Sequence, residues 1–199
     1  MRYFALRASV LFFVTTAGWS TAARAQSGWF WQNPLPQGNE LRAVAALSPR
    51  VTVAVGDVGT IVRTTDAGAT WTLQDSGTRL DLRGVSFVDA NIGIGTAVGR
   101  SGTILRTTDG GATWMPQLSG TTVILNGVSF VNANIGWAVG AFEYTGLGVI
   151  VHTTDGGDTW TPEYAPSKWT LLSVSFVNPC TGIAVGSYGT IIRTDTGGM

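Results

Sequence analysis

The chain has 199 residues, of which 44% are hydrophobic, and its 12 basic and 12 acidic side chains leave no net charge. This balance argues against the polybasic surface of a nucleic-acid-binding protein or of a protein that adheres to anionic membranes. With 27 glycines and only 12% charged residues, the composition is poor for helices and rich in turns. Cys180 is the single cysteine, so neither an intrachain disulfide nor a cysteine zinc site can form.

Residues 1–25 have the pattern of a secretory signal peptide. Arg2 and Arg7 give a basic start, residues 8–19 are mostly apolar, and Ala23-Arg24-Ala25 is a small-x-small cleavage site. The alternative is a membrane anchor, but the apolar run is shorter than the roughly 20 residues that span a bilayer. We therefore expect an exported, periplasmic or extracellular protein without a membrane span after cleavage. Its mature chain, residues 26–199, would carry 9 basic and 12 acidic residues.

An eight-residue phrase, T-x-D-x-G-x-T-W, occurs three times, at Thr64–Trp71, Thr107–Trp114 and Thr153–Trp160, and a fourth copy begins at Arg193. The copies align on four leucines spaced 41, 43 and 46 residues apart, namely Leu41, Leu82, Leu125 and Leu171. A repeat of about 40 residues built from short strands is typical of a β-propeller. The sequence thus predicts an all-β propeller domain over 26–199, with repeats 41–81, 82–124, 125–170 and 171–199.

Each copy is predicted to form four antiparallel strands separated by turn residues. In the second copy these are Leu82–Val88, a strand around Ala97-Val98-Gly99, Gly102–Thr107, and a strand after Trp114. The inner strands are apolar on both faces, as expected where sheets pack face to face. The recurrent Ala-Val-Gly suggests a strand near the crowded propeller axis.

The repeated phrase has a structural interpretation of its own. An Asp that begins a turn accepts hydrogen bonds from the backbone of that turn, and a Gly tolerates a positive φ there. A Trp would then cover the hairpin. Because these residues recur in every copy, we interpret them as architecture rather than as catalysts or metal ligands: Asp66, Gly68, Trp71, Asp109, Gly111, Trp114, Asp155, Gly157 and Trp160.

The fourth copy departs from the pattern, because Thr196 stands where Asp is expected and Asp195 comes one place early. Trp29–Asn33 reads as an orphan strand, and Trp29 precedes Leu41 by nearly the interval that separates each Trp from the next opening Leu. Residues 26–40 are therefore predicted to be a closing strand and linker that completes a fourth blade. The alternative is a fragment of a longer propeller.

The sequence closely resembles the photosynthesis system II assembly and stability factor family, whose repeats are of the Asp-box or BNR type. The resemblance rests on V-S-F-V-D-A-N-I-G at Val85–Gly93, then Ala97-Val98-Gly99, then G-T-I-L-R-T-T-D-G-G-A-T-W at Gly102–Trp114. Residues 41–194 carry it throughout. The family implies a propeller that acts as a protein-binding scaffold and holds partner proteins, possible members of a membrane complex, during assembly.

Function is expected where the copies differ. The loops that join strand two to three and strand four to one share one rim, which would carry Asp57, Arg79, Lys168 and eight candidate partner-binding residues: Arg42, Arg83, Arg100, Phe142, Glu143, Tyr144, Trp169 and Tyr188. Arginine and exposed aromatic residues are typical of protein–protein hot spots. Phe142 and Tyr144 belong to a five-residue insertion within Ala141–Gly148. The alternative is an ordinary solvated loop surface.

A basic residue precedes each repeated phrase, at Arg63, Arg106, His152 and Arg193. This row could meet an acidic partner or donate hydrogen bonds to neighbouring backbone. A lone His with no nearby Cys, His or carboxylate pair does not indicate a metal site, so we expect neither a metal nor a cofactor.

Asp-boxes also occur in sialidases, which require an arginine cluster, a tyrosine nucleophile and a separate acid. Glu143 and Tyr144 are adjacent in sequence, so on an extended strand they would face opposite ways. Nor is a facing carboxylate pair evident. We therefore expect an exported, non-catalytic binding scaffold with a protein partner and no nucleic acid. The alternatives are a carbohydrate-binding or sialidase-like glycosidase propeller and a truncated fragment.

Overall fold

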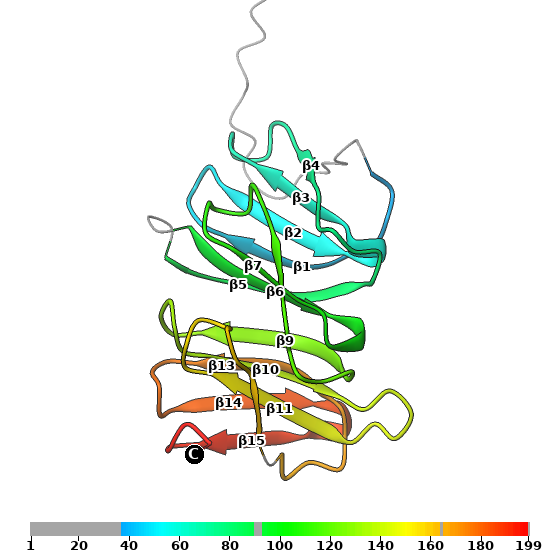
Figure 1. Ribbon diagram of the computed structural model, residues 1–199, viewed down its shortest axis with the longest axis vertical. Coiled ribbons are helices and arrows are strands. Elements are labelled where there is room, and N and C mark those ends of the chain that lie inside the picture. Colours follow the sequence, from blue (N-terminus) through cyan, green and yellow to red (C-terminus); the bar gives the residue numbers. More distant parts are fainter. Residues whose placement is uncertain (1–36, 90–92, 164, 199) are drawn as a thin grey trace, which may run out of the picture. The chain divides into compact units, whose positions relative to one another are not determined.

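The structure, a computed structural model, describes residues 37–89, 93–163 and 165–198. All of them belong to the second of two compact units, Pro34–Met199. The expected signal peptide and orphan strand 29–33 lie outside the described residues. The described chain is all-β, as predicted, and consists of four antiparallel sheets with three short 3-10 turns (Figure 1).

Each sheet follows the chain from its first strand to its last. The first contains β1 (Leu41–Ala46), β2 (Thr52–Gly56), β3 (Ile61–Thr64) and β4 (Thr72–Gln74). The second contains β5 (Leu82–Asp89), β6 (Ile94–Gly99), β7 (Ile104–Thr107) and β8 (Met115–Gln117). The third contains β9 (Ile124–Phe130), β10 (Gly136–Ala141), β11 (Gly148–Thr153) and β12 (Thr161–Glu163). The fourth contains β13 (Leu171–Phe176), β14 (Gly182–Gly186) and β15 (Ile191–Thr194).

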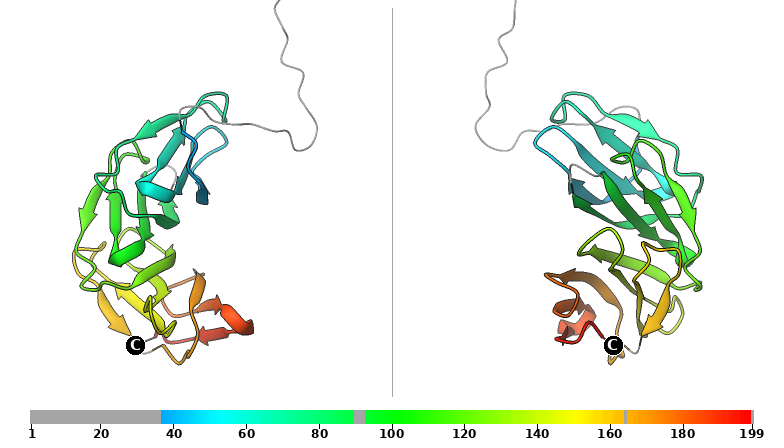
Figure 2. Two further views of the ribbon diagram at one scale, coloured as in Figure 1. Left: turned by 90° about the vertical axis from the view of Figure 1, so that its right-hand side faces the viewer. Right: turned by 60° about the vertical axis from the view of Figure 1, so that its left-hand side comes forward.

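The propeller prediction is confirmed by these four blade-like sheets, and the fourth has three strands within the described residues. Consecutive sheets pack against each other in chain order, and the four do not close into a ring (Figure 2). The predicted closing strand cannot be placed, because residues 26–36 are outside the described part of the chain.

The apolar core lies between the sheets. Val53, Val55 and Ile61 of the first sheet pack on Leu82 and Leu105 of the second. Equivalent clusters fill the space between the second and third sheets and between the third and fourth. Strands β2, β6 and β10 are accordingly buried on both faces, as their unbroken apolar sequence predicts.

The Ala-Val-Gly strand is the second of each sheet, whereas the first strands β1, β5, β9 and β13 lie beside one another in consecutive sheets. Crowding near the axis therefore does not explain its glycine. A Cβ at Gly99 would lie 2.1 Å from the carbonyl oxygen of Asp81, which precedes β5. Glycine is needed at this point because two backbones of the same sheet approach closely.

The repeated phrase forms the turn between the third and fourth strands of each four-stranded sheet. In the second sheet, Asp109 accepts hydrogen bonds of 2.9 Å from the backbone N–H groups of Ala112 and Thr113 and one of 2.6 Å from the Thr113 hydroxyl. Gly111 has φ of +84°, and a Cβ there would meet Val53 at 2.8 Å. The turn therefore also forms part of the contact with the preceding sheet.

Hydrogen bonding sets the acidity of these aspartates. The pKa of Asp66 falls to about 2, mainly because the backbone N–H and hydroxyl of Thr70 donate to its carboxylate. Partial burial opposes the fall at Asp109, but donation by Thr113, Thr107 and Ala112 outweighs it, and the pKa is again about 2. The pKa of Asp155 is lowered for the same reason, by Thr159. All three are charged at neutral pH and held by their own turns.

The fourth turn keeps part of this pattern without the aspartate. The Thr194 hydroxyl accepts from the N–H of Gly198 at 2.9 Å, as the hydroxyl of Thr107 accepts from Gly111. Trp137 of β10 stacks on Phe176 of β13 with ring centroids 3.6 Å apart, and its Nε1 donates to the Gly197 carbonyl at 3.0 Å. A tryptophan from the preceding sheet thus covers Phe176. In the second and third sheets the equivalent phenylalanine is covered by a tryptophan of its own sheet: Phe87 by Trp114, and Phe130 by Trp160.

Candidate functional site

Three short turns and one longer loop form the rim at which the copies differ. The turns are η1 (Asp57–Gly59), η2 (Arg100–Gly102) and η3 (Ser187–Gly189), and the loop joins β10 to β11. Each turn is bonded to the segment that precedes its own first strand, for example from Arg100 N to Asp81 O at 2.9 Å. Strand-two-to-three turns and strand-four-to-one segments therefore lie together, and we call this surface the loop rim.

The middle residue of each short turn has left-handed backbone, although none is glycine. Val58, Ser101 and Tyr188 have φ of 56°, 52° and 55°. Left-handed backbone costs non-glycine residues free energy, most of all a β-branched one such as valine. The same geometry in three copies is a feature of the fold, and it directs three chemically different side chains outward: all three are exposed.

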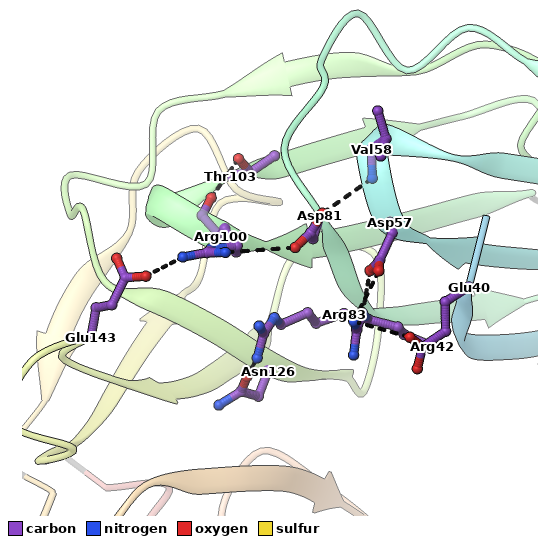
Figure 3. A network of polar contacts seen from close by, with 10 residues as sticks. All are labelled: Glu40, Arg42, Asp57, Val58, Asp81, Arg83, Arg100, Thr103, Asn126 and Glu143. Carbon is purple, nitrogen blue, oxygen red and sulfur yellow. Dashed lines mark hydrogen bonds and ion pairs between the residues drawn. The ribbon is translucent and has the colours of Figure 1, made fainter.

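The first candidate arginine is paired with acidic groups (Figure 3). Arg42 donates from Nε to Asp57 Oδ1 and from Nη2 to Asp57 Oδ2, the latter at 3.0 Å, and Glu40 lies 3.5 Å from Nη2. The hydrogen bond from Arg42 lowers the pKa of Asp57 and raises the pKa of Arg42. Both groups therefore remain charged across the physiological pH range, and the pair fixes the start of β1 against η1.

Arg100 connects two sheets across the rim. Its Nη2 donates to Glu143 in the inserted loop of the third sheet, and its Nη1 lies 3.8 Å from Asp81 Oδ2 (Figure 3). Asp81 also accepts from the backbone N–H of Val58 in the first sheet at 3.1 Å. Loops from three sheets are thereby held in one polar network.

Arg83 belongs to a separate series of side-chain hydrogen bonds, called here the ladder, that connects the first strands of consecutive sheets. Its Nη1 donates to Asn126 Oδ1 at 3.1 Å, and Asn126 Nδ2 donates to the Leu171 carbonyl at 2.8 Å. Figure 3 shows Arg83 and Asn126 reaching toward each other from adjacent sheets. The ladder links the second sheet to the third and the third to the fourth.

Four aromatic candidates remain exposed on the same rim. Trp169 and Tyr188 contact each other with ring centroids 4.4 Å apart, and they are 48% and 84% exposed. Phe142 and Tyr144, in the inserted loop, are 52% and 97% exposed. The inserted loop is bonded to the segment that carries Trp169, because Thr170 Oγ1 donates to Gly146 O at 3.3 Å and Gly148 N donates to Ser167 O at 3.3 Å.

The structure therefore divides the eight candidates into a polar half around the first three sheets and an aromatic half around the third and fourth. Glu143 and Tyr144 lie in a turn rather than on an extended strand, so strand alternation does not determine the directions of their side chains. Sequence reasoning missed Glu40, Asp81 and Asn126. Their places beside the opening leucines were the available signal, but no repeated motif marks them.

The basic row before the repeated phrases lies away from this rim. Arg63 donates to the Gly110 carbonyl at 2.8 Å and Arg106 donates to the Ala133 carbonyl, so both reach the backbone of the next sheet. His152 differs, since its Nδ1 lies 2.7 Å from Glu163 Oε1. Burial raises the pKa of Glu163, although His152 opposes the rise.

The described residues contain no group of three or more histidine, cysteine or acidic side chains arranged to hold a metal ion. Among them, no helix combines the length and apolar character needed to cross a membrane.

Solved structures with a similar fold include two proteins named YCF48. The first is YCF48 bound to D1 peptide, with a TM-score of 0.62 and 20% identity, which covers 78% of this chain and 49% of the other. The second is YCF48 from Cyanidioschyzon merolae, with a TM-score of 0.61 and 22% identity, covering 82% and 55%. The chain thus spans about half the length of these structures.

A glycoside hydrolase has a comparable fold at lower identity. An ancestral GH74 enzyme matches with a TM-score of 0.63 and 11% identity over 78% of this chain and 25% of that one. At such identities the likeness shows the fold alone. A comparison with curated proteins gives no significant match.

The sequence profile of the family described as Photosynthesis system II assembly factor YCF48 matches residues 73–163. This segment holds the second repeat and most of the third, including the Asp-boxes at Asp109 and Asp155. The resemblance to the photosynthesis system II assembly factor-like propeller family is therefore confirmed by sequence over residues 73–163, and the two YCF48 structures share the fold.

Proposed function

We propose that the chain is an exported, non-catalytic scaffold that binds a segment of a partner protein on the loop rim. The aromatic half of the rim is the observation that carries this proposal. Trp169, Tyr188, Phe142 and Tyr144 present large apolar surface to solvent from neighbouring loops. Exposed apolar clusters bordered by polar groups are a common feature of protein-interaction sites.

The polar half supports the same proposal by holding the loops in place. Arg100, Glu143 and Asp81 connect the inserted loop to the turns of the first two sheets. Loops fixed in advance lose less conformational entropy when a ligand binds, so a preorganised rim binds more tightly than a mobile one. The arginines act here as positioning residues, while the aromatic side chains would contact the ligand.

The relatives favour a peptide-like ligand over a reaction. One YCF48 structure is described as bound to D1 peptide. We extend the same class of ligand, a protein segment, to this chain and make no claim that the partner is the same. The GH74 likeness favours no catalytic residue here, because Glu143 is engaged by Arg100 and Glu163 lies beside His152.

Selection of a phage-displayed peptide library on the full chain tests the proposal, with a labelled D1 peptide as a further probe. We expect enriched peptides whose affinity, measured by fluorescence polarisation, falls at least about tenfold in the double variant Trp169→Ala, Tyr188→Ala, since two hot-spot aromatic residues are removed. Val177→Ala is the matched control, because Val177 is 79% exposed in the turn that joins the first strand of the fourth sheet to the second, which is outside the loop rim. Equal affinity in all three proteins, or no enrichment at all, would refute the proposal.

A reporter-glycoside assay with Glu143→Gln tests the carbohydrate alternative. We expect no turnover in either protein. Turnover by the full chain that the substitution abolishes would replace the scaffold with a glycosidase.

A further inference from the structure

The fourth sheet exposes apolar side chains on all three of its described strands. Ile183 and Val185 of β14 are 46% and 40% exposed, and Ile191 of β15 is 72% exposed. Leu172 of β13 adds a fourth apolar side chain at 50% exposure. We call these four residues the free face.

The positions of Ile183, Val185 and Ile191 are buried in the preceding sheets, except that Ile150 of the third sheet is half-buried. Val53, Val55 and Ile61, which correspond to Ile183, Val185 and Ile191, are 0% exposed in the first sheet. Val98, Ile104 and Val139 are at most 1% exposed at the corresponding places of the second and third sheets. These residues are covered because each packs on the sheet that follows it in the chain. The free face is therefore the surface that, in the preceding sheets, packs on the sheet that follows. Among the described residues no sheet packs on it.

The first sheet exposes part of the complementary half. Leu82, Leu125 and Leu171 open their sheets at 0% exposure, because each packs on the sheet before it, whereas Leu41 is 39% exposed. Val44 is 67% exposed. Ala54 and Val62, on the neighbouring strands, are buried. Exposed apolar groups thus occur on both the first and the fourth sheet. They stand at the positions through which consecutive sheets pack on each other within the chain.

The polar contacts between sheets also have counterpart residues at both ends. Arg63 of the first sheet donates to the carbonyl of Gly110, in the Asp-box turn of the second sheet. Arg193 holds the place of Arg63 in the fourth sheet, and its side chain is 61% exposed, 3.6 Å from Asp195. In the first sheet, Ala67 holds the place of Gly110. A contact of the fourth sheet with another first sheet would bring Arg193 to the Ala67 carbonyl.

The contact would join two unlike surfaces, the fourth sheet of one copy and the first sheet of the other. A contact between unlike surfaces forms a closed ring when its rotation closes and an open filament when it does not. Two copies related by a two-fold axis would make the contact twice and leave neither surface exposed.

We propose that the free face packs on the first sheet of a second copy of this chain, and that two copies form one closed ring. The interaction is apolar at Ile183, Val185 and Ile191 on one side and at Leu41 and Val44 on the other. It repeats between copies the packing that already joins consecutive sheets within the chain. The proposal does not depend on the function of the loop rim.

Light scattering coupled to size-exclusion chromatography of the full chain gives the first test. We expect twice the monomer mass, shifting to the monomer mass on dilution. Ile191→Glu and Val44→Lys should each yield a folded monomer, because both side chains are exposed in the single chain. Leu118→Glu, an equally drastic change on an exposed side chain elsewhere, should remain a dimer. Circular dichroism confirms that each variant is folded.

Mixing the two monomeric variants distinguishes this arrangement from others. A ring of one Ile191→Glu copy and one Val44→Lys copy has one unaltered contact and one Glu–Lys contact, so the mixture should regain the dimer mass. A dimer that forms through two free faces would be insensitive to Val44→Lys. That result would overturn the proposal, as would a wild-type monomer at every concentration or an open series of larger species.

Discussion

Three aspartates, Asp66, Asp109 and Asp155, show how single residues define the turns of this protein. In each turn the threonine four residues after the aspartate donates two hydrogen bonds to the carboxylate, one from the threonine backbone N–H and one from its hydroxyl. Exposed carboxylates with several donors are stabilised in the charged form, which lowers their pKa. Their recurrence and their bonding within one turn both assign them a structural role, and we therefore propose the loop rim as the functional surface.

The lowered pKa values predict a dependence of stability on pH. Asp66 and Asp109 have a folded-state pKa of about 2, below the roughly 3.9 of an unfolded chain. Their contribution to the free energy of unfolding is present above the unfolded-state pKa and is lost as pH falls through the folded-state pKa. Thermal unfolding followed by circular dichroism should therefore show Tm decreasing from about pH 4 to about pH 2.

The triple variant Asp66→Asn, Asp109→Asn, Asp155→Asn provides the comparison. Because asparagine does not titrate there, its Tm should be lower at neutral pH and should change less across the same interval. Parallel pH profiles for the two proteins would contradict this assignment.

The left-handed turn residue Val58 gives a second prediction at this scale. Valine at φ of 56° is strained, and glycine adopts this backbone freely. Val58→Gly should raise the free energy of unfolding by about 1 kcal/mol, measured by urea denaturation. Gly59→Ala, the neighbouring control, should lower it, since a Cβ at Gly59 would lie 2.1 Å from the Thr78 carbonyl oxygen. Destabilisation by Val58→Gly would show that valine makes contacts that outweigh the strain.

Strands and turns were the part of the structure most readily predicted from the sequence. The opening leucines, the Ala-Val-Gly segments and the repeated phrase each mark a local structure, and the structure has strands or turns at those places. The three strands expected within residues 171–194 are β13, β14 and β15. Local patterns suffice here because strand periodicity and turn chemistry act over a few residues.

Contacts between copies could not be predicted in this way. Arg100 with Glu143 and Trp169 with Tyr188 join loops far apart in sequence, and their meeting depends on how the sheets pack. The glycine of Ala-Val-Gly was misattributed for the same reason: sequence indicates that a small residue is required, but the approaching Asp81 carbonyl is known only from the structure.

Trp137 gives the prediction at the scale of elements. The residue is 1% exposed, and from the third sheet its side chain covers Phe176 of the fourth sheet. Trp137→Ala should lower the free energy of unfolding by about 3–5 kcal/mol, as expected for a large buried aromatic side chain, in urea denaturation followed by fluorescence. Leu118→Ala, at 88% exposure, should change it by less than about 0.5 kcal/mol. A loss below about 1 kcal/mol for Trp137→Ala would mean that the fourth sheet packs without this residue.

At the scale of the whole molecule, four sheets packed in chain order present two distinct surfaces. Asp-box turns join the third strands to the fourth, whereas the loop rim is formed by turns that join the second strands to the third. The rim varies between copies, and the Asp-box turns are uniform. This separation is the physical basis for assigning stability to one set of turns and recognition to the other.

The expected closing strand belongs to this scale too. The sequence also predicts that residues 26–36, which lie outside the described part of the chain, complete a fourth sheet, and closure within one chain in this way is the alternative to the ring of two copies. Deleting them should lower Tm, because β15 would then lack a neighbouring strand on its outer side. An unchanged Tm in differential scanning calorimetry would show that they do not complete a sheet.

Hydrogen exchange with and without a selected peptide tests the central claim, recognition on the loop rim, most directly. Binding should slow exchange in residues 142–148, 167–170 and 187–189, which carry the exposed aromatic side chains. The Asp-box turns at 64–71, 107–114 and 153–160 should exchange at unchanged rates. Protection confined to the Asp-box turns, with the rim unaffected, would contradict the account.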